Sequence, residues 1–262
     1  MPRTRGRPPS FMAGTLEVRQ LVKTYAGRTV VDRVSFRLRS GEVIGLLGRN
    51  GAGKTTSFRM AIGMIRPRSG IVILNGEDVT EQPMYRRAQR GLGYLAQEPA
   101  VFRRLSVEQN IAAILELRGW KRKDIKKRVD ELLAEFGLQM VRNNKAGSLS
   151  GGERRRLEIA RALSTNPQIM LLDEPLYGVD PIAVSEIIKL IHSLRRRDIG
   201  ILITEHNVEK VLPILDRAYI IHEGRVIFSG SPDEVVANEA VREFYLGRDF
   251  RLPDASASSS GD

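Results

Sequence analysis

The sequence predicts an α/β fold in which a helical segment interrupts the core. Three observations carry this prediction. Short apolar runs alternate with helical patterns, which is typical of a parallel sheet with helices packed on it. The apolar run Val43–Leu47 leads directly into a glycine-rich stretch, which in turn leads into a helical pattern. From residue 98 to 165 the periodicity is helical, and strand and helix patterns alternate again after that segment.

The first part of the chain predicts several strands. Residues 16–22 and 30–38 alternate between apolar and polar side chains, as half-exposed strands do. Val43–Leu47 is apolar throughout and predicts a buried parallel strand. Residues 71–74, followed by Asn75 and Gly76, predict a further strand and a tight turn, and residues 91–95 predict a short strand that ends before Gln97.

The helical segment contains one clear amphipathic helix. Its apolar face is formed by Ile125, Val129, Leu132, Leu133 and Phe136. Basic residues crowd the start of this helix, where we expect a solvated face. The single tryptophan, Trp120, lies at that junction, and we expect it to pack rather than to act in function.

The last part of the chain returns to strand and helix alternation. Residues 169–172 and 199–204 predict buried strands, and a helix between them is marked by Ile187, Leu190, Ile191 and Leu194. Residues 218–221 and 225–228 predict a hairpin. A last helix carries Val241, Phe244 and Tyr245.

Composition excludes some classes of protein. The 262 residues suffice for one large domain, and no window approaches the roughly 18 consecutive apolar residues of a membrane span. There are no cysteines, which excludes disulfides and thiolate metal sites. The net charge of +11 is compatible with nucleic acid, an anionic membrane face or a solvated basic surface, so charge alone decides nothing. Residues 1–14 carry Arg3, Arg5 and Arg7 among prolines, and we expect a disordered basic tail.

The glycine-rich stretch fits G-x-x-x-x-G-K-[ST], a loop whose backbone N–H groups wrap nucleotide phosphates. We expect Lys54 to reach the β and γ oxygens and the Thr55 hydroxyl to ligate Mg²⁺. The alternative is a strand–helix turn without a ligand. The candidate ATP-binding residues of this loop are Gly48, Arg49, Asn50, Gly51, Ala52, Gly53, Lys54, Thr55 and Thr56.

Two carboxylates follow the predicted strand 169–172. Asp173 can hold Mg²⁺, and Glu174 can polarise the attacking water. In an open α/β sheet, ligands gather at the carboxyl ends of the strands. Two adjacent acids could instead cap a helix, but together with a phosphate loop the catalytic interpretation is favoured.

Three further residues complete a candidate site. His206 follows the strand 199–204 at the same sheet edge and could orient the water. Gln97 follows a short strand and could bridge metal and water. Tyr25 could stack on adenine, with a core aromatic as the alternative.

Residues 149–153 place Ser150, Gly151, Gly152 and Glu153 before a helix, which is an anion site in principle and a helix cap otherwise. With the phosphate loop, Gln97, Asp173, Glu174, Asp180 and His206 in this order, the chain resembles the ATP-binding subunits of ABC transporters over residues 15–237. The resemblance implies a P-loop NTPase (RecA-like) core with an antiparallel β subdomain and an inserted α-helical subdomain.

The resemblance also implies roles and partners. Catalysis would involve Glu174, His206 and Gln97, and Mg²⁺ would be bound by Thr55, Gln97 and Asp173. A homodimer would close on two ATP molecules, so that Ser150, Gly151, Gly152 and Glu153 contact the ATP of the opposite subunit. Asp180 would lie in the loop that joins the two sites. Two integral-membrane transporter subunits would hold the dimer at the cytoplasmic face of the inner membrane, with membrane association through these partners.

A narrower resemblance is to the ATPase of lipopolysaccharide export systems. It rests on residues 93–98, 102–107, 149–161, 204–208 and, above all, 245–252. It makes Phe102, Arg103 and Arg104 candidates for the groove that receives the membrane subunits. The ATPase of a branched-chain amino acid importer is the alternative. A soluble ABC ATPase acting on nucleic acid is not expected, because no long coiled coil separates the phosphate loop from residues 149–153.

Some positions depart from the family pattern, namely Arg49, Ala96, Glu205 and the bulkier pair Leu176-Tyr177, and none of them removes a group that the chemistry needs. The predicted organisation is a basic tail over 1–14, an ATPase domain over 15–237, a helical extension over 238–252 and a disordered end over 253–262. Within the ATPase domain, the core is 15–97 with 166–237, and the helical subdomain is 98–165.

Overall fold

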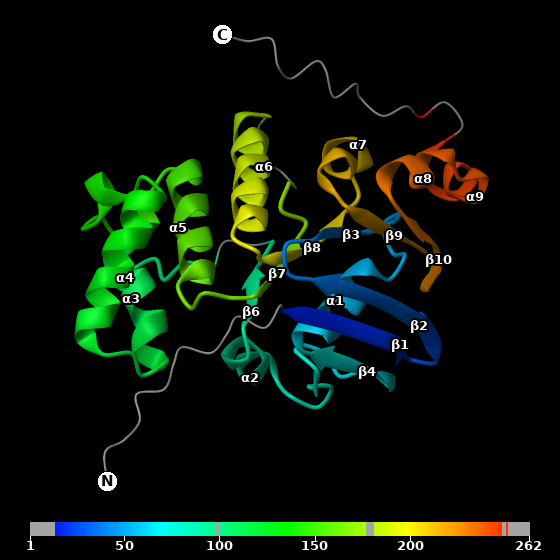
Figure 1. Ribbon diagram of the computed structural model, residues 1–262, viewed down its shortest axis with the longest axis horizontal. Coiled ribbons are helices and arrows are strands. Elements are labelled where there is room, and N and C mark those ends of the chain that lie inside the picture. The colour runs from blue at the N-terminus through cyan, green and yellow to red at the C-terminus, as the bar shows by residue number, and fades with distance from the viewer. Residues whose placement is uncertain (1–13, 98–99, 177–180, 248–249, 251–262) are drawn as a thin grey trace.

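The computed structural model describes residues 14–97, 100–176, 181–247 and 250, with the backbone alone for 181–183. Its strands form two sheets, one with the order β2-β1-β4-β5 and one with the order β10-β9-β3-β8-β7-β6 (Figure 1). Helices pack on both sheets, and a further group of helices stands to one side (Figure 1). The predicted α/β fold with an antiparallel part and an inserted helical part is therefore confirmed.

The four-stranded sheet is antiparallel throughout. It contains β1 (Thr15–Tyr25), β2 (Arg28–Arg39), β4 (Ser69–Leu74) and β5 (Glu77–Asp78). Alternate side chains such as Leu16, Val18 and Phe36 face an apolar cluster shared with the first helix. Gly14, directly before β1, makes two hydrogen bonds to Ser40. Its N–H donates to the Ser40 hydroxyl at 2.7 Å, and its carbonyl accepts from the Ser40 N–H.

The six-stranded sheet carries the parallel core. β3 (Val43–Leu47) lies between β8 (Gly200–Glu205) and β9 (Arg217–His222), and β8 continues to β7 (Ile169–Asp173) and β6 (Leu92–Leu95). All of these neighbours are parallel, whereas β10 (Arg225–Gly230) closes an antiparallel hairpin with β9. Every residue of β3, β7 and β8 is buried, as their continuous apolar runs predict. Their carboxyl ends therefore meet at one edge of the sheet.

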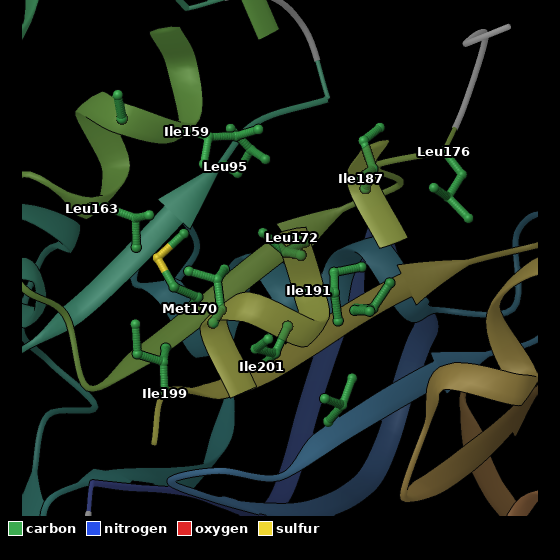
Figure 2. Packing of buried hydrophobic residues seen from close by; sticks show 14 of the residues in the cluster. Leu95, Ile159, Leu163, Met170, Leu172, Leu176, Ile187, Ile191, Ile199 and Ile201 are labelled. Carbon is green, nitrogen blue, oxygen red and sulfur yellow. The ribbon is translucent and has the colours of Figure 1, made fainter. Parts of the chain in front are cut away.

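Helices cover this core on both faces. α1 (Lys54–Ile62) lies between the two sheets and contacts strands of both. α6 (Pro181–Arg196) packs on the other face, where Ile187 and Ile191 meet Leu172 and Ile201 of the sheet (Figure 2). α2 (Met84–Gln89) precedes β6.

The inserted helices are α3 (Val107–Leu117), α4 (Arg122–Glu135) and α5 (Gly151–Leu163), with the short turns η1 (Gln139–Val141) and η2 (Ala146–Ser148) between them. Ile159 and Leu163 of α5 pack towards Leu95 and Met170, which joins this group to the sheet (Figure 2). Trp120 packs against the same apolar cluster, as predicted.

The C-terminal segment returns to the sheet. It comprises α7 (Val208–Val211), η3 (Leu212–Ile214), α8 (Pro232–Ala237), α9 (Glu239–Val241) and the π-helical turn η4 (Arg242–Leu246). The single last helix of the sequence prediction is thus two short turns. Within the described part of the chain, no helix has the length and apolar character needed to span a bilayer.

Candidate ATP site

The phosphate loop connects β3 to α1 and is shaped by glycine. Gly51 and Gly53 have φ angles of 80° and 106°, in the left-handed region that favours glycine. At Gly48 a side chain is excluded by packing as well, because a Cβ there would lie 2.2 Å from the Ile221 carbonyl oxygen. The loop is therefore packed closely against the end of β9.

The first turn of α1 is open to an anion. Gly53 is the N-cap residue, and no side chain caps the helix there. The N–H groups of a helix's first turn have no partner within the helix, and they carry the positive end of its dipole. This arrangement fits a phosphate group at the start of α1.

Lys54 curls back over the loop. Its Nζ donates to the carbonyl oxygens of Gly48 at 2.6 Å and Arg49 at 3.0 Å, and the side chain is buried. Burial lowers the pKa of Lys54, and the negative charges of Glu174, Glu205 and Asp173 oppose that effect. A charged ammonium is thus held where the loop would enclose phosphate oxygens.

The two predicted carboxylates stand at the end of β7, where β8 supports them. The Thr204 hydroxyl donates to Asp173 Oδ1 at 2.7 Å, and the Glu174 N–H donates to the Thr204 carbonyl and hydroxyl oxygens, both at 3.1 Å. Glu174 has a φ of 42°, which is an uncommon conformation for a residue with a side chain. Backbone strain of this kind is concentrated at functional sites.

Gln97 and His206 both approach Glu174. The Gln97 Nε2 donates to Glu174 Oε2 at 3.2 Å, and the same oxygen lies 3.9 Å from His206 Nδ1. These three residues follow β6, β7 and β8, so the parallel sheet brings their side chains together as the sequence predicts. The arrangement can hold a carboxylate that accepts a proton from water.

Glu205 is a member of the site that the sequence analysis treated only as a departure from the family pattern. Its carboxylate is buried and accepts from the Leu176 N–H at 2.9 Å and the His206 N–H at 3.2 Å. Burial raises the pKa of Glu205. It therefore links the chain after β7 to the chain after β8. The signal that could have found it is an acidic residue at the end of a strand whose other residues, apart from Thr204, carry no polar side chain.

The oxygen donors suit magnesium. Mg²⁺ is usually held by one or two carboxylates, phosphate oxygens and water rather than by an all-protein cage. Among the residues described, no three His, Cys, Asp or Glu side chains cluster as a metal site. Asp173 at the end of β7 and Thr55 in the first turn of α1 supply a carboxylate and a hydroxyl, and Gln97 supplies an amide.

Ser150 and Glu153 form a capping box at the start of α5. The Glu153 N–H donates to the Ser150 hydroxyl oxygen at 3.3 Å, and the Ser150 N–H donates to the Glu153 carboxylate at 2.9 Å. The Ser150 hydroxyl also donates to this carboxylate at 2.7 Å, and the hydrogen bonds from the Ser150 hydroxyl and N–H lower the pKa of Glu153. Within one chain the helix-cap interpretation is therefore correct. Gly151 is exposed on the same turn, and Gly152 is half-buried.

Tyr25 lies at the end of β1 and is 45% exposed. The alternative of a core aromatic is therefore wrong. The Lys23 ammonium lies 5.2 Å from the ring centroid. An exposed ring of this kind is free to stack on a planar ligand.

The candidate groove residues lie on a loop held by Asn110, which is fully buried in α3. Asn110 Oδ1 accepts from the Phe102 N–H at 2.8 Å, and its amide donates to the Phe102 carbonyl at 3.0 Å. Phe102 is 46% exposed, and the Arg161 guanidinium carbon lies 4.6 Å from the centroid of the Phe102 ring. Arg103 and Arg104 are exposed beside it.

A cleft of about 310 Å³ adjoins this loop, between α2, β6, α3 and α5. Its walls include Met84, Tyr94, Ile114, Arg118 and Arg161. Arg161 thus belongs both to the cleft and to the contact with Phe102. Asp180, the predicted inter-site residue, lies outside the described residues.

Two family models match the chain. One is described as ABC transporter and matches residues 31–177, and the other is described as Branched-chain amino acid ATP-binding cassette transporter and matches residues 225–251.

Individual proteins are similar over nearly their whole length. A probable ABC transporter ATP-binding protein of Azorhizobium caulinodans is 52% identical over 93% of this chain and 87% of its own. The lipopolysaccharide export system ATP-binding protein LptB of Haemophilus influenzae is 49% identical over 90% of this chain and 99% of its own. The crystal structure of MJ1267, an ATP-binding cassette of an ABC transporter in its ADP conformation, superposes with a TM-score of 0.79 at 27% identity, covering 89% of this chain and 99% of that one.

Proposed function

Since the chain belongs to the ATP-binding subunits of ABC transporters and is an ATPase that works with membrane subunits, we propose that it powers the extraction of lipopolysaccharide from the inner membrane toward the outer membrane. The observation that carries this proposal is the identity of about half of all residues to lipopolysaccharide export ATP-binding proteins, over nine-tenths or more of both chains. Family membership alone does not name the transported substrate, so lipopolysaccharide as that substrate is the content of the proposal.

In the proposed mechanism, the phosphates of ATP lie in the loop from Gly48 to Thr56. The first-turn N–H groups of α1 and the Lys54 ammonium bind them, and Tyr25 stacks on the adenine. Thr55, Asp173 and Gln97 would hold Mg²⁺, which when bound supplies positive charge beside the transferred phosphoryl group.

Glu174 accepts a proton from the attacking water as the bond from the water oxygen to the γ-phosphorus forms, while the bond from the γ-phosphorus to the bridging oxygen breaks and ADP leaves. Gln97 and His206 fix the Glu174 carboxylate through the 3.2 Å and 3.9 Å contacts. The Thr204 hydrogen bonds fix the main chain of Glu174 from below. Positioning of this kind, together with electrostatic stabilisation, carries most of the catalysis in phosphoryl transfer.

A second copy of the chain completes the site in this proposal. The residues that bind phosphate lie at α1, whereas Ser150, Gly151, Gly152 and Glu153 lie at α5, in the helical group (Figure 1). In a homodimer that closes on two ATP molecules, the start of α5 from one subunit covers the ATP bound by the other. Asp180 lies in the loop between the two sites in this arrangement.

Two integral-membrane subunits are the proposed partners, and they hold the dimer at the cytoplasmic face of the inner membrane. Their docking site is the cleft between α2, β6, α3 and α5 with the adjoining Phe102, Arg103 and Arg104. The position of this surface supports the proposal, because Arg161 belongs to α5, and Gln97, which follows the β6 wall of the cleft, donates to Glu174. No nucleic-acid partner is expected.

A branched-chain amino acid importer remains the alternative transport system. Its support is the family match over residues 225–251. That match covers most of the C-terminal segment that the sequence analysis used to favour export, so this segment does not by itself separate the two systems. The relatives that are about half identical over nearly the full length favour export.

Affinity purification of the full-length chain from native membranes tests the proposal. We expect lipopolysaccharide exporter membrane subunits to co-purify, and their loss when Arg103 is changed to Glu. The matched control is Arg196→Glu, the same change at an exposed position of α6, which should keep the partners. Recovery of importer permeases without exporter subunits would refute export.

A further inference from the structure

The C-terminal turn η4 reaches the ATP site through one tyrosine. The Tyr245 hydroxyl donates to the His206 carbonyl oxygen at 3.4 Å, and the N–H of Gly48 lies on the same tyrosine oxygen. Gly48 begins the phosphate loop, and His206 contacts Glu174. A single hydroxyl therefore lies between the loop that binds phosphate and the histidine beside the proposed base.

The rest of the segment keeps this tyrosine in place. Val241 of α9 is fully buried, and the Phe244 ring stacks on His222 with ring centroids 4.9 Å apart. Leu246 and Tyr245 pack against the main apolar cluster. Burial raises the pKa of Tyr245, so the hydroxyl stays a hydrogen-bond donor at neutral pH. In Figure 1, α8 and α9 lie beside the β9–β10 hairpin, whose turn contacts the phosphate loop through the hydrogen bond from the Gly224 N–H to the Ala52 carbonyl.

The hydrogen bond from Tyr245 reaches the main chain of His206, which other hydrogen bonds already hold. The His206 N–H donates to Glu205, which also accepts from the Leu176 N–H. Glu205 thus fixes the amide side of His206, and Tyr245 fixes its carbonyl side. With both sides held, the main chain that carries the imidazole stays in place beside Glu174.

We propose that Tyr245 is a positioning residue for ATP hydrolysis, which holds the main chain of His206 in register with the phosphate loop at Gly48. Its hydroxyl acts through His206 rather than on the nucleotide. The inference rests on the proposed role of His206 in hydrolysis. It assigns the C-terminal segment a part in the chemical step, separate from any part in subunit contact.

The test is Tyr245→Phe in the full-length chain, with ATP hydrolysis measured across ATP concentrations. The change keeps the ring that packs on the core and removes only the hydroxyl. We expect kcat to fall about fivefold, the equivalent of one ordinary hydrogen bond expressed in the transition state, and KM for ATP to stay within about twofold.

Tyr219→Phe is the matched control. The Tyr219 hydroxyl also makes two main-chain hydrogen bonds, accepting from the Arg37 N–H at 3.1 Å and donating to its carbonyl at 3.3 Å, but away from the ATP site. A loss of stability alone would affect both variants alike. We expect a reduced kcat for Tyr245→Phe and an unchanged kcat for Tyr219→Phe.

Histidine ring resonances give a readout that does not depend on activity. The chain has three histidines, His192, His206 and His222, so the signals can be assigned by substitution. Tyr245→Phe should shift or broaden the His206 resonance and leave His192 unchanged, and Tyr219→Phe should move neither.

The variants His206→Ala and His206→Ala with Tyr245→Phe separate this inference from the role of His206. Residues that act through one another are not additive, so the second change should cost less than about twofold in the first background. A loss of turnover in His206→Ala but not in Tyr245→Phe would overturn this inference alone, whereas normal turnover in His206→Ala would overturn the role of His206 and this inference with it.

An unchanged kcat in folded Tyr245→Phe, or a raised KM at unchanged kcat, would also overturn the proposal. If Tyr245→Phe does not fold, Phe244→Ala decides. That ring is 42% exposed, so its removal loosens η4 from the outside. A reduced kcat with unchanged KM supports the proposal, and an unchanged kcat refutes it.

Discussion

The last turn of α1, the helix that follows the phosphate loop, contacts a fully buried arginine of α2. Replacing this arginine is the sharpest test of what stabilises the packing of α1. Arg87 of α2 donates to the carbonyl oxygens of Met60 at 2.8 Å and Ala61 at 2.7 Å, which lie in the last turn of α1. It also donates to the carbonyls of Thr80 and Gln82, both at 2.9 Å. The guanidinium thus caps α1 and ties it to the turn after β5. We predict that Arg87→Met strongly destabilises the protein.

The magnitude follows from two opposing terms. Hydrogen bonds from a charged donor contribute about 1.5 to 3 kcal/mol each, so the loss of four would cost at least about 6 kcal/mol. Burial lowers the pKa of Arg87 to about 10, and relative to its ordinary value this corresponds to about 3 kcal/mol that the substitution recovers. Methionine also keeps the packing of the aliphatic stem. We therefore expect the free energy of unfolding to fall by about 3 to 5 kcal/mol, as is typical when buried polar groups lose their partner.

Urea unfolding followed by circular dichroism measures this change. The control is Arg86→Met, which makes the same replacement one residue earlier at an exposed position and should change the free energy of unfolding by less than about 0.5 kcal/mol. If the free energy of unfolding of Arg87→Met lies within about 1 kcal/mol of the wild-type value, the hydrogen bonds from Arg87 do not stabilise the end of α1 and the reasoning is wrong.

Three other predictions concern the ATP site. Glu174→Gln should retain ATP and trap the closed dimer on gel filtration, while turnover falls on the order of a hundredfold or more; near-normal turnover would remove Glu174 from the role of base, and the exposed Glu186→Gln is the control. Lys54→Ala should abolish ATP binding in calorimetry, and a wild-type Kd would contradict the phosphate contact. Burial raises the pKa of Glu205 above its ordinary 4.5. The folded state therefore binds the carboxyl proton of Glu205 more tightly than the unfolded chain does, and the free energy of unfolding declines as the pH rises above 4.5. Glu205→Gln should therefore raise the melting temperature at pH 7 and not at pH 4, and a gain at pH 4 alone would contradict this.

The presence of most strands along the chain could be predicted because each has a local signature. The apolar runs in β3, β7 and β8 predict strands buried on both faces, and the alternation in β1 and β2 predicts strands buried on one. The C-terminal end was harder. A periodic pattern at Val241, Phe244 and Tyr245 predicts a helix, but the chain forms α9 and a π turn, because packing of these side chains against β9 and the core decides the backbone there.

The sequence by itself determined the chemistry of this protein. A phosphate loop, two carboxylates, a glutamine and a histidine stand directly after apolar strands, and the geometry of a parallel sheet brings such positions to one edge. The tertiary structure alone decided what holds these groups. Thr204, Glu205 and Tyr245 lie in stretches that carry the resemblance to export ATPases, but neither these residues nor Arg87 show in the sequence what they contact, because their partners are distant along the chain. Long-range hydrogen bonds leave no spacing pattern in the sequence, so they become visible only when the strands are in place.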